Sequence, residues 1–208
     1  MKKRLIVNSN STNLLNELVT SLKECKNFYF SVAFINFSGL QLLLDPLKES
    51  EDRGVKGRII TSTYLNFTEV KALEKINKFN NIELKVFNKV EEKGFHTKVY
   101  IFEYEETYKV IIGSANITQS ALKSNIEWNV EIISKNKSEF VRDVTKEYNY
   151  LWDISSDASA DLISEYERFL ETIKNTTYTP QLVFERGEYI TPNKMQKRAM
   201  ENLDRLRY

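Results

Sequence analysis

The strongest constraint on the fold is an alternation of short apolar runs with stretches of helical spacing in the first half of the chain. Asn27–Ile35 is aromatic, β-branched and nearly continuous in apolar residues, which is typical of a buried strand. Lys56–Thr61 and Ile82–Phe87 are two further strand-like runs, whereas Leu40–Lys48 and Glu69–Phe79 have the apolar spacing of helices. Strands that alternate with helices predict an α/β fold with some parallel strand pairing.

The second half of the chain adds strands that are expected to pair in the antiparallel sense. Thr97–Tyr104 and Tyr108–Gly113 are strand-like runs joined by the short polar link Glu105–Thr107, which favours a hairpin. Glu127–Ser134 alternates polar and apolar residues and is predicted to be a further strand. Together with the parallel pairs, these strands predict a mixed β-sheet inside a layered α/β/α sandwich.

Three more stretches have the spacing of amphipathic helices. The first is Asn10–Cys25, for which Ser11 or Thr12 is the expected N-cap. The second is Ser138–Trp152 and the third is Asp161–Ile173. With the two helices between the strands, they are the candidates for the helical layers of the sandwich.

The overall composition is that of a globular protein with its own core, since 41% of the residues are hydrophobic. The net charge is +1, so any nucleic-acid site must be a local patch. The only cysteine, Cys25, cannot form an internal disulfide and is expected to be a small buried side chain. The apolar stretch near the N-terminus stops at Asn8, too early for a signal peptide, and no run approaches a membrane span. We therefore expect a cytoplasmic protein with no membrane partner.

His96, the only histidine, lies two residues before Lys98 at the start of a predicted strand. The two-residue period of a strand puts His96 and Lys98 on one face, with Thr97 and Val99 on the other. A neutral imidazole can attack phosphorus or exchange protons near pH 7, and an ammonium offsets the charge on phosphate oxygens. The pair suits phosphate chemistry, although alone it is more typical of a structural or solvated histidine.

The sequence Gly113-Ser114-Ala115-Asn116 ends the neighbouring strand of the predicted hairpin. Gly113 is expected to let the backbone approach a ligand closely. Ser114 and Asn116 supply a hydroxyl and a carboxamide, both donors to phosphate oxygens. In isolation these residues would be an ordinary turn, but the hairpin brings them beside the histidine, which makes the combination far more specific.

This combination resembles the phospholipase D superfamily, which has His-x-Lys, an acidic residue after four more positions, and then Gly-Ser-x-Asn. Here the acidic position holds Glu103 where aspartate is usual, and the stretch from Glu103 to Gly113 is longer than the common pattern. A further family glutamate corresponds to Glu127, and Glu131, on the same strand face, is a rival whose alternative is a solvated surface acid. The resemblance covers roughly Asn10–Trp152 and implies a phospholipase D-like fold.

The resemblance also implies a role for each site residue. His96 would be the nucleophile, forming a phosphohistidine intermediate, while Lys98, Ser114 and Asn116 would bind the phosphate. Glu127 would orient a histidine.

The family site needs two such motifs, and this chain has one. It therefore resembles the single-motif nucleases, in which two chains pair across a two-fold axis, so that His96 of the second copy protonates the leaving oxygen. One histidine, one cysteine and no tight carboxylate cluster argue against a zinc or two-metal site. The family likewise implies catalysis without a metal or another cofactor.

The chain divides into an expected phospholipase D-like phosphodiesterase domain at 1–174, a linker at 175–190 and a distinct segment at 191–208. Pro192–Gln196 and the basic residues that follow resemble the segment just before the Walker A loop of superfamily 2 helicases, although a plain amphipathic helix is an equal alternative. Phospholipase D-like nuclease domains occur fused ahead of such helicases in restriction and defence systems. No P-loop is present, so the chain is not expected to hydrolyse ATP.

The sequence thus predicts a homodimeric, metal-independent nuclease domain that acts on nucleic acid, DNA in preference. We expect it to be the N-terminal part of a longer protein, with a helicase domain in cis. Two alternatives stay open: a catalytically weak module for nucleic-acid binding and dimerisation, and a hydrolase of small phosphodiesters or phospholipids.

Overall fold

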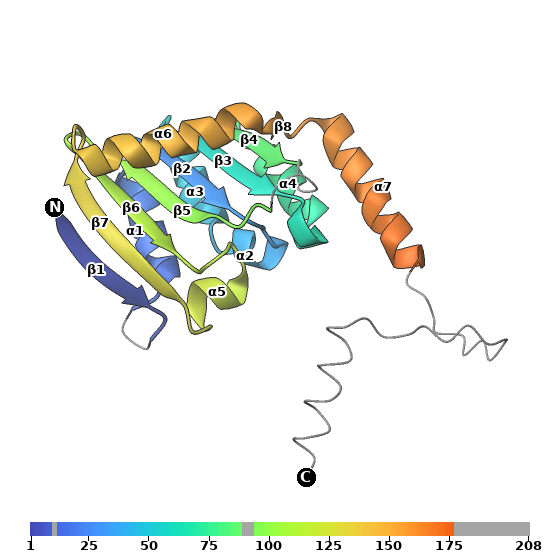
Figure 1. The fold of residues 1–208 in the computed structure, drawn as a ribbon, viewed down its shortest axis with the longest axis horizontal. Helices are drawn as coiled ribbons and strands as arrows, with labels where there is room; N and C mark the ends of the chain where they lie inside the picture. Colours follow the sequence, from blue (N-terminus) through green and yellow to red (C-terminus); the bar gives the residue numbers. More distant parts are fainter. Residues whose placement is uncertain (10–11, 89–93, 177–208) are drawn as a thin grey trace, which may run out of the picture. The chain divides into compact units, whose positions relative to one another are not determined.

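The computed structural model describes residues 1–9, 12–88 and 94–176. In this part of the chain, eight strands form one sheet in the order β1-β7-β6-β5-β2-β3-β4-β8 (Figure 1). Their bounds are β1 (Lys2–Val7), β2 (Asn27–Val32), β3 (Lys56–Ser62), β4 (Ile82–Phe87), β5 (Lys98–Glu103), β6 (Thr107–Gly113), β7 (Trp128–Lys135) and β8 (Ser156–Asp157). Strand β3 pairs in parallel with β2 and with β4, and the other neighbours are antiparallel, which confirms the predicted mixed sheet.

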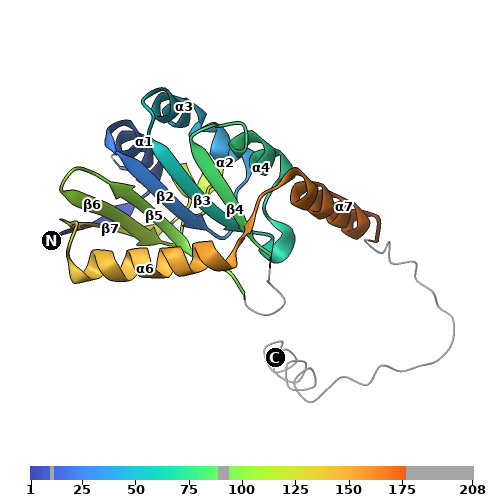
Figure 2. The same cartoon turned by 90° about the horizontal axis from the view of Figure 1, so that it is seen from above.

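Helices cover both faces of this sheet. Figure 2 shows α1, α3 and α4 on one face and the long helix α6 on the other, so the predicted α/β/α layering is confirmed. The helical elements are α1 (Leu14–Glu24), α2 (Phe37–Gln41), α3 (Leu44–Asp52), the 3-10 turn η1 (Tyr64–Asn66), α4 (Val70–Ile76), α5 (Gln119–Lys123), α6 (Glu139–Ile154) and α7 (Ala160–Thr176).

Strand β2 is apolar on both sides because it lies between two cores. Phe30 belongs to the core under α1, where its ring centroid lies 5.1 Å from that of Tyr100 and 5.5 Å from that of Phe102. Tyr29 points to the opposite face and meets Tyr148 of α6 at a centroid distance of 5.6 Å. A strand buried on both faces needs a continuous apolar run, which is the pattern that its sequence has.

The predicted hairpin is confirmed and sets the position of the site. Strands β5 and β6 pair in antiparallel register from Val99 opposite Ile112 to Glu103 opposite Tyr108. The start of β5 and the end of β6 therefore lie at the same end of the sheet.

Two sequence-based expectations about helices were wrong. The expected single helix at Leu40–Lys48 is two helices, α2 and α3, because Pro46 lacks the amide hydrogen that a continuous helix would need and its ring would clash with the preceding turn. Pro46 is instead accommodated in the first turn of α3. The N-cap of α1 is Asn13, whose side chain accepts a hydrogen bond from the Asn16 amide, rather than Ser11 or Thr12.

Strand β1, helix α5 and strand β8 were not expected from the sequence. Strand β1 pairs with β7 at the edge of the sheet, and five of its six residues are at least partly exposed, so it lacks the apolar signal of a buried strand. Helix α5 and strand β8 are too short to show a periodic pattern.

No helix in the described ranges has the length and apolar character that crossing a membrane requires. The expected segment at 191–208 and all but the first two residues of the expected linker lie outside the described residues, and the domain division stays a prediction.

Cys25 is 2% exposed, as expected for a small core side chain, and its thiol donates a hydrogen bond to the Leu22 carbonyl oxygen at 3.7 Å. Burial raises the pKa of the Cys25 thiol to about 11, because a thiolate loses its hydration there. We expect a thiol reagent such as DTNB to react with the native protein far more slowly than with the protein in denaturant. Equal rates in both conditions would contradict the burial of Cys25.

Candidate active site

The two motif elements meet at the end of the sheet where the parallel strands β2 and β3 have their carboxyl ends. Val32, the last residue of β2, pairs with Lys98, the first residue of β5. Gly113, the last residue of β6, pairs with Asn129 at the start of β7. The loops that follow β2, β3 and β6 therefore surround the start of β5, a position where α/β sheets commonly bind ligands.

His96 and Lys98 lie side by side at this end of the sheet. Lys98 is 6% exposed, and its Nζ lies 2.7 Å from His96 Nδ1 and donates to the His96 carbonyl oxygen at 2.9 Å. The His96 side chain is exposed. Thr97, which directly precedes β5, faces the other way, toward Ser31, with 2.6 Å between their hydroxyl oxygens. The imidazole is therefore open to a ligand while the ammonium supports it from within.

The environment of Lys98 changes the acidity of its ammonium. Burial lowers the pKa of Lys98 below its ordinary value, and the nearby Glu127 carboxylate opposes part of this effect. Glu127 therefore stabilises a positive charge on Lys98, the charge state that attracts a phosphate.

Gly113 packs closely against strand β7. A Cβ atom at this position would lie 2.2 Å from Asn129 Oδ1 and 2.4 Å from the Trp128 carbonyl oxygen. Its missing side chain makes room for strand β7, and the expected close approach of its backbone to a ligand stays a prediction.

Ser114 links the end of β6 to Glu127. Its hydroxyl donates a hydrogen bond to the Glu127 carboxylate and accepts one from the Trp128 amide at 3.1 Å. Ser114 and His96 are exposed and Glu127 is partly exposed. Three predicted site residues, His96, Ser114 and Glu127, thus lie at one end of the sheet with accessible polar groups.

Asn116 is 6% exposed and lies under the loop that follows β2. Its Oδ1 accepts a hydrogen bond from the Phe34 amide at 3.3 Å, which fixes the orientation of the carboxamide. Within the described residues, Asn116 Nδ2 donates no hydrogen bond, so this amino group is available to a phosphate oxygen.

Asn129 is a residue of the site region for which no role was predicted from the sequence. It is 1% exposed, its Oδ1 accepts from the Ala115 amide at 3.4 Å, and its Nδ2 has no partner among the described residues. Tyr100 holds the same loop from the other side, where its hydroxyl donates to the Ala115 carbonyl oxygen at 3.0 Å. A polar residue at an inward position of an alternating strand was the available signal for Asn129.

The other two acidic candidates, Glu103 and Glu131, lie away from this end of the sheet. Glu103, at the far end of β5, accepts hydrogen bonds from the Tyr29 hydroxyl at 3.0 Å and from Asn27 Nδ2 at 2.9 Å. Glu131 is 3% exposed and binds Arg4 of β1 through two hydrogen bonds of 3.1 and 2.8 Å. The alternative reading of Glu131 as a solvated surface acid was wrong, because Arg4 compensates the charge of a buried carboxylate.

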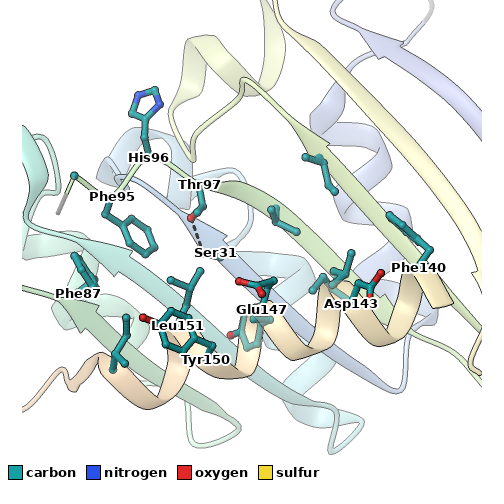
Figure 3. Close-up of a pocket in the computed structure, with 17 residues that line it drawn as sticks. Ser31, Phe87, Phe95, His96, Thr97, Phe140, Asp143, Glu147, Tyr150 and Leu151 are labelled. Carbon is teal, nitrogen blue, oxygen red and sulfur yellow. Dashed lines mark hydrogen bonds between the residues drawn. The ribbon is translucent and has the colours of Figure 1, made fainter. Parts of the chain in front are cut away.

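An apolar groove of about 500 Å³ lies between the sheet and α6, with His96 at one end. Figure 3 shows the His96 ring directed away from the α6 side chains, whereas Phe95 and Leu151 line the groove. Asp143 and Glu147 of α6 add acidic groups to its wall. Phosphate would be repelled there, so the groove suits an apolar group rather than a phosphodiester.

This end of the sheet therefore brings together an exposed imidazole, an ammonium, a hydroxyl and a carboxamide. All four can donate hydrogen bonds or positive charge to a tetrahedral anion. Within the described ranges, no group of three or more His, Cys, Asp or Glu side chains is arranged to hold a metal ion.

Comparison with known families gives one match, over residues 18–152, to the family model described as "Cardiolipin synthase, PLD-like domain". No curated protein matches the sequence significantly.

Three solved structures illustrate the likeness of the fold. NucT from Helicobacter pylori (TM-score 0.59, 18% identity) covers 75% of this chain and 98% of its own. Nuc from Salmonella typhimurium, a phospholipase D family member, gives a TM-score of 0.58 at 19% identity with the same two coverages. Yeast tyrosyl-DNA phosphodiesterase gives 0.51 at 15% identity, covering 79% of this chain and 40% of its own. At such identities these likenesses concern the fold alone.

The positions of Glu127 and Glu131 predict that their substitutions change stability by different amounts. We expect Glu131→Ala to lower the free energy of unfolding by about 2–4 kcal/mol, because Arg4 and Lys109 lose their carboxylate partner. Glu127→Ala, at a partly exposed position, should change it by less than about 1 kcal/mol. Urea unfolding followed by circular dichroism measures both, and an undisturbed Glu131→Ala protein would contradict a structural role for that residue.

Proposed function

The chain belongs to the phospholipase D superfamily through its PLD-like domain, and from this premise we propose that it hydrolyses phosphodiester bonds of nucleic acid with His96 as the nucleophile. One observation carries the proposal: the only histidine is exposed at this end of the sheet, in contact with Lys98 and beside the loop of Ser114 and Asn116. A histidine with a purely structural role would have its ring buried in the core.

In the proposed reaction, the lone pair of His96 Nε2 attacks phosphorus and the bond from phosphorus to the leaving oxygen breaks. Lys98, Ser114 and Asn116 Nδ2 donate to the non-bridging oxygens as negative charge builds up on them. The leaving oxygen takes a proton from a general acid. Water then attacks the phosphohistidine and frees the imidazole, and the conjugate base of that acid accepts the water proton.

We propose that the general acid is His96 of a second copy, because one chain supplies only one histidine. Support comes from an exposed apolar surface beside the site, the β7 surface, in which Ile126 is 95% and Trp128 68% exposed. Leu5, Val130 and Ile112 continue it across β1, β7 and β6 in register. A patch of this kind is typical of a protein interface.

The contact between His96 Nδ1 and Lys98 also favours a shared site. A charged Lys98 donates to Nδ1 and so leaves the ring proton on Nε2, the nitrogen that must attack. The reverse tautomer needs an acceptor for a proton on Nδ1, such as a carboxylate. We propose that Glu127 of the second copy supplies it, since Glu127 lies next to the β7 surface.

Nucleic acid is the proposed substrate, DNA in preference, and yeast tyrosyl-DNA phosphodiesterase shares the fold at 15% identity. The helicase-like sequence at Pro192–Gln196 supports it from outside the described residues, and we propose a helicase region in cis and a cytoplasmic setting. A second candidate, hydrolysis of a lipid phosphodiester, is favoured by the apolar groove beside His96 and by the name of the matching family.

His96→Ala should slow the cleavage of DNA and RNA oligonucleotides by several orders of magnitude, because it removes the nucleophile. The melting temperature should not change, because His96 lies at an exposed position. Cleavage by the wild-type protein should continue in EDTA, since histidine and lysine supply the nucleophile and the charge. The assay includes bis-(p-nitrophenyl) phosphate and phosphatidylglycerol vesicles. Wild-type turnover by the variant, or loss of activity in EDTA, contradicts the mechanism, and cleavage of the lipid alone would favour the second candidate.

Mixing experiments test the shared site. When His96→Ala protein is added to a fixed amount of wild type and subunits are allowed to exchange, the activity should fall, because mixed dimers lack one of the two histidines. The matched control is the double variant Trp128→Asp, His96→Ala, whose β7 surface carries a charge and which should leave wild-type activity unchanged. If neither protein reduces the activity, each chain works alone.

A further inference from the structure

The loop that follows β3, Thr63–Thr68, presents apolar side chains to solvent at the same end of the sheet as His96. Leu65 is 59% exposed and Phe67 53% exposed. The loop is joined to the site region, because the Glu69 amide donates to the Ile35 carbonyl oxygen at 3.0 Å in the segment that follows β2.

This loop is held in an unusual conformation. Leu65 and Asn66 both have positive φ angles, of 56° and 59°, which side chains with a Cβ adopt at a cost in free energy. Thr68 is buried, and its hydroxyl donates to the Ser62 carbonyl oxygen at 2.6 Å. The Tyr166 hydroxyl of α7 donates to the Thr68 carbonyl oxygen at 3.0 Å. The fold thus holds the loop with Leu65 and Phe67 facing water, where neither is needed for the core.

Phe34 connects the exposed ring to the proposed phosphate site. The ring centroids of Phe34 and Phe67 lie 5.3 Å apart with an interplanar angle of 56°, so the partly buried Phe34 supports Phe67 from below. The amide of the same Phe34 donates to Asn116 Oδ1 at 3.3 Å. A single residue therefore touches both the ring and the carboxamide that we assign to the phosphate.

We propose that Phe67, supported by Phe34, is a stacking platform for an unpaired nucleobase next to the scissile phosphate. This inference rests on the proposed function and adds a substrate class, single-stranded nucleic acid or a nucleotide displaced from a duplex. Aromatic rings bind bases of every kind through their faces, so the platform gives preference for single strands without preference for sequence. A duplex keeps its bases stacked on one another, and Phe67 has no base to bind there.

A lipid surface is the other class of partner that an exposed apolar loop can contact. Loops and helices that bind membranes generally combine their apolar tips with lysine or arginine, which pair with anionic headgroups. Thr63–Glu69 contains neither residue and contains one acid, Glu69. The ring pair and the rigid loop match a flat aromatic ligand better than the disordered interior of a bilayer.

The test compares an oligothymidine with a fully abasic oligomer of the same length. We expect Phe67→Ala to lower kcat/KM for the oligothymidine by roughly 5- to 100-fold, the range of one lost base stack, and to leave the abasic oligomer unaffected. Phe67→Trp should keep most of the activity. Phe169→Ala, which removes a ring that is 51% exposed on α7, is the matched control and should change neither substrate.

Binding of the same oligomers, followed by fluorescence anisotropy in the His96→Ala background, separates the platform from the chemistry. If the wild type cleaves neither oligomer but Phe67→Ala still weakens binding of oligothymidine alone, the proposed function fails and the platform stands. Equal losses on both oligomers, or no loss on either, would overturn the platform. So would a Phe67→Ala defect confined to binding of phosphatidylglycerol vesicles, which would assign the loop to a membrane.

Discussion

The site depends on the antiparallel pairing of β5 with β6. Because Val99 lies opposite Ile112, the residues just before β5 and just after β6 meet at one end of the sheet, although His96 and Asn116 are 20 positions apart in the sequence. A shift of this register by one residue would turn Lys98 to the other face and away from Ser114. The pairs of β5 with β2 and of β6 with β7 hold the register on both sides, and Gly113 permits the close approach of β7.

The electrostatics at this end of the sheet depend on two glutamates that have different roles. Glu131 compensates Arg4 inside the sheet and takes no part in the open region, whereas Glu127 lies near Lys98 and accepts from Ser114. Burial makes the charge on Lys98 costly, and Glu127 reduces that cost without occupying the Lys98 ammonium. We propose that such a site attracts a phosphate, because a positive charge that is poorly hydrated gains more from an anion than a hydrated one does.

Much of this arrangement could be predicted from the sequence because it follows from local patterns. The alternation expected at the start of the predicted strand put His96 and Lys98 on one face, although β5 itself begins at Lys98, and the short polar link predicted the hairpin that brings Ser114 and Asn116 close. Contacts between residues far apart in the sequence could not be predicted in this way. Arg4 and Glu131 are 127 positions apart, so nothing local indicated that Glu131 is a buried structural acid. The edge strand β1, the role of Gly113 against Asn129, and the position of Phe67 beside Phe34 likewise depend on tertiary packing.

A covalent intermediate on His96 is the central claim of this account. The most direct measurement is a single-turnover reaction with a uniformly ³²P-labelled oligonucleotide, quenched with alkali and followed by peptide mapping in a mass spectrometer. The account predicts an acid-labile, alkali-stable nucleotide adduct on the peptide that contains His96, and no adduct on the His96→Ala protein. Cleavage by the wild type without any such adduct, or an adduct on another residue, would contradict it.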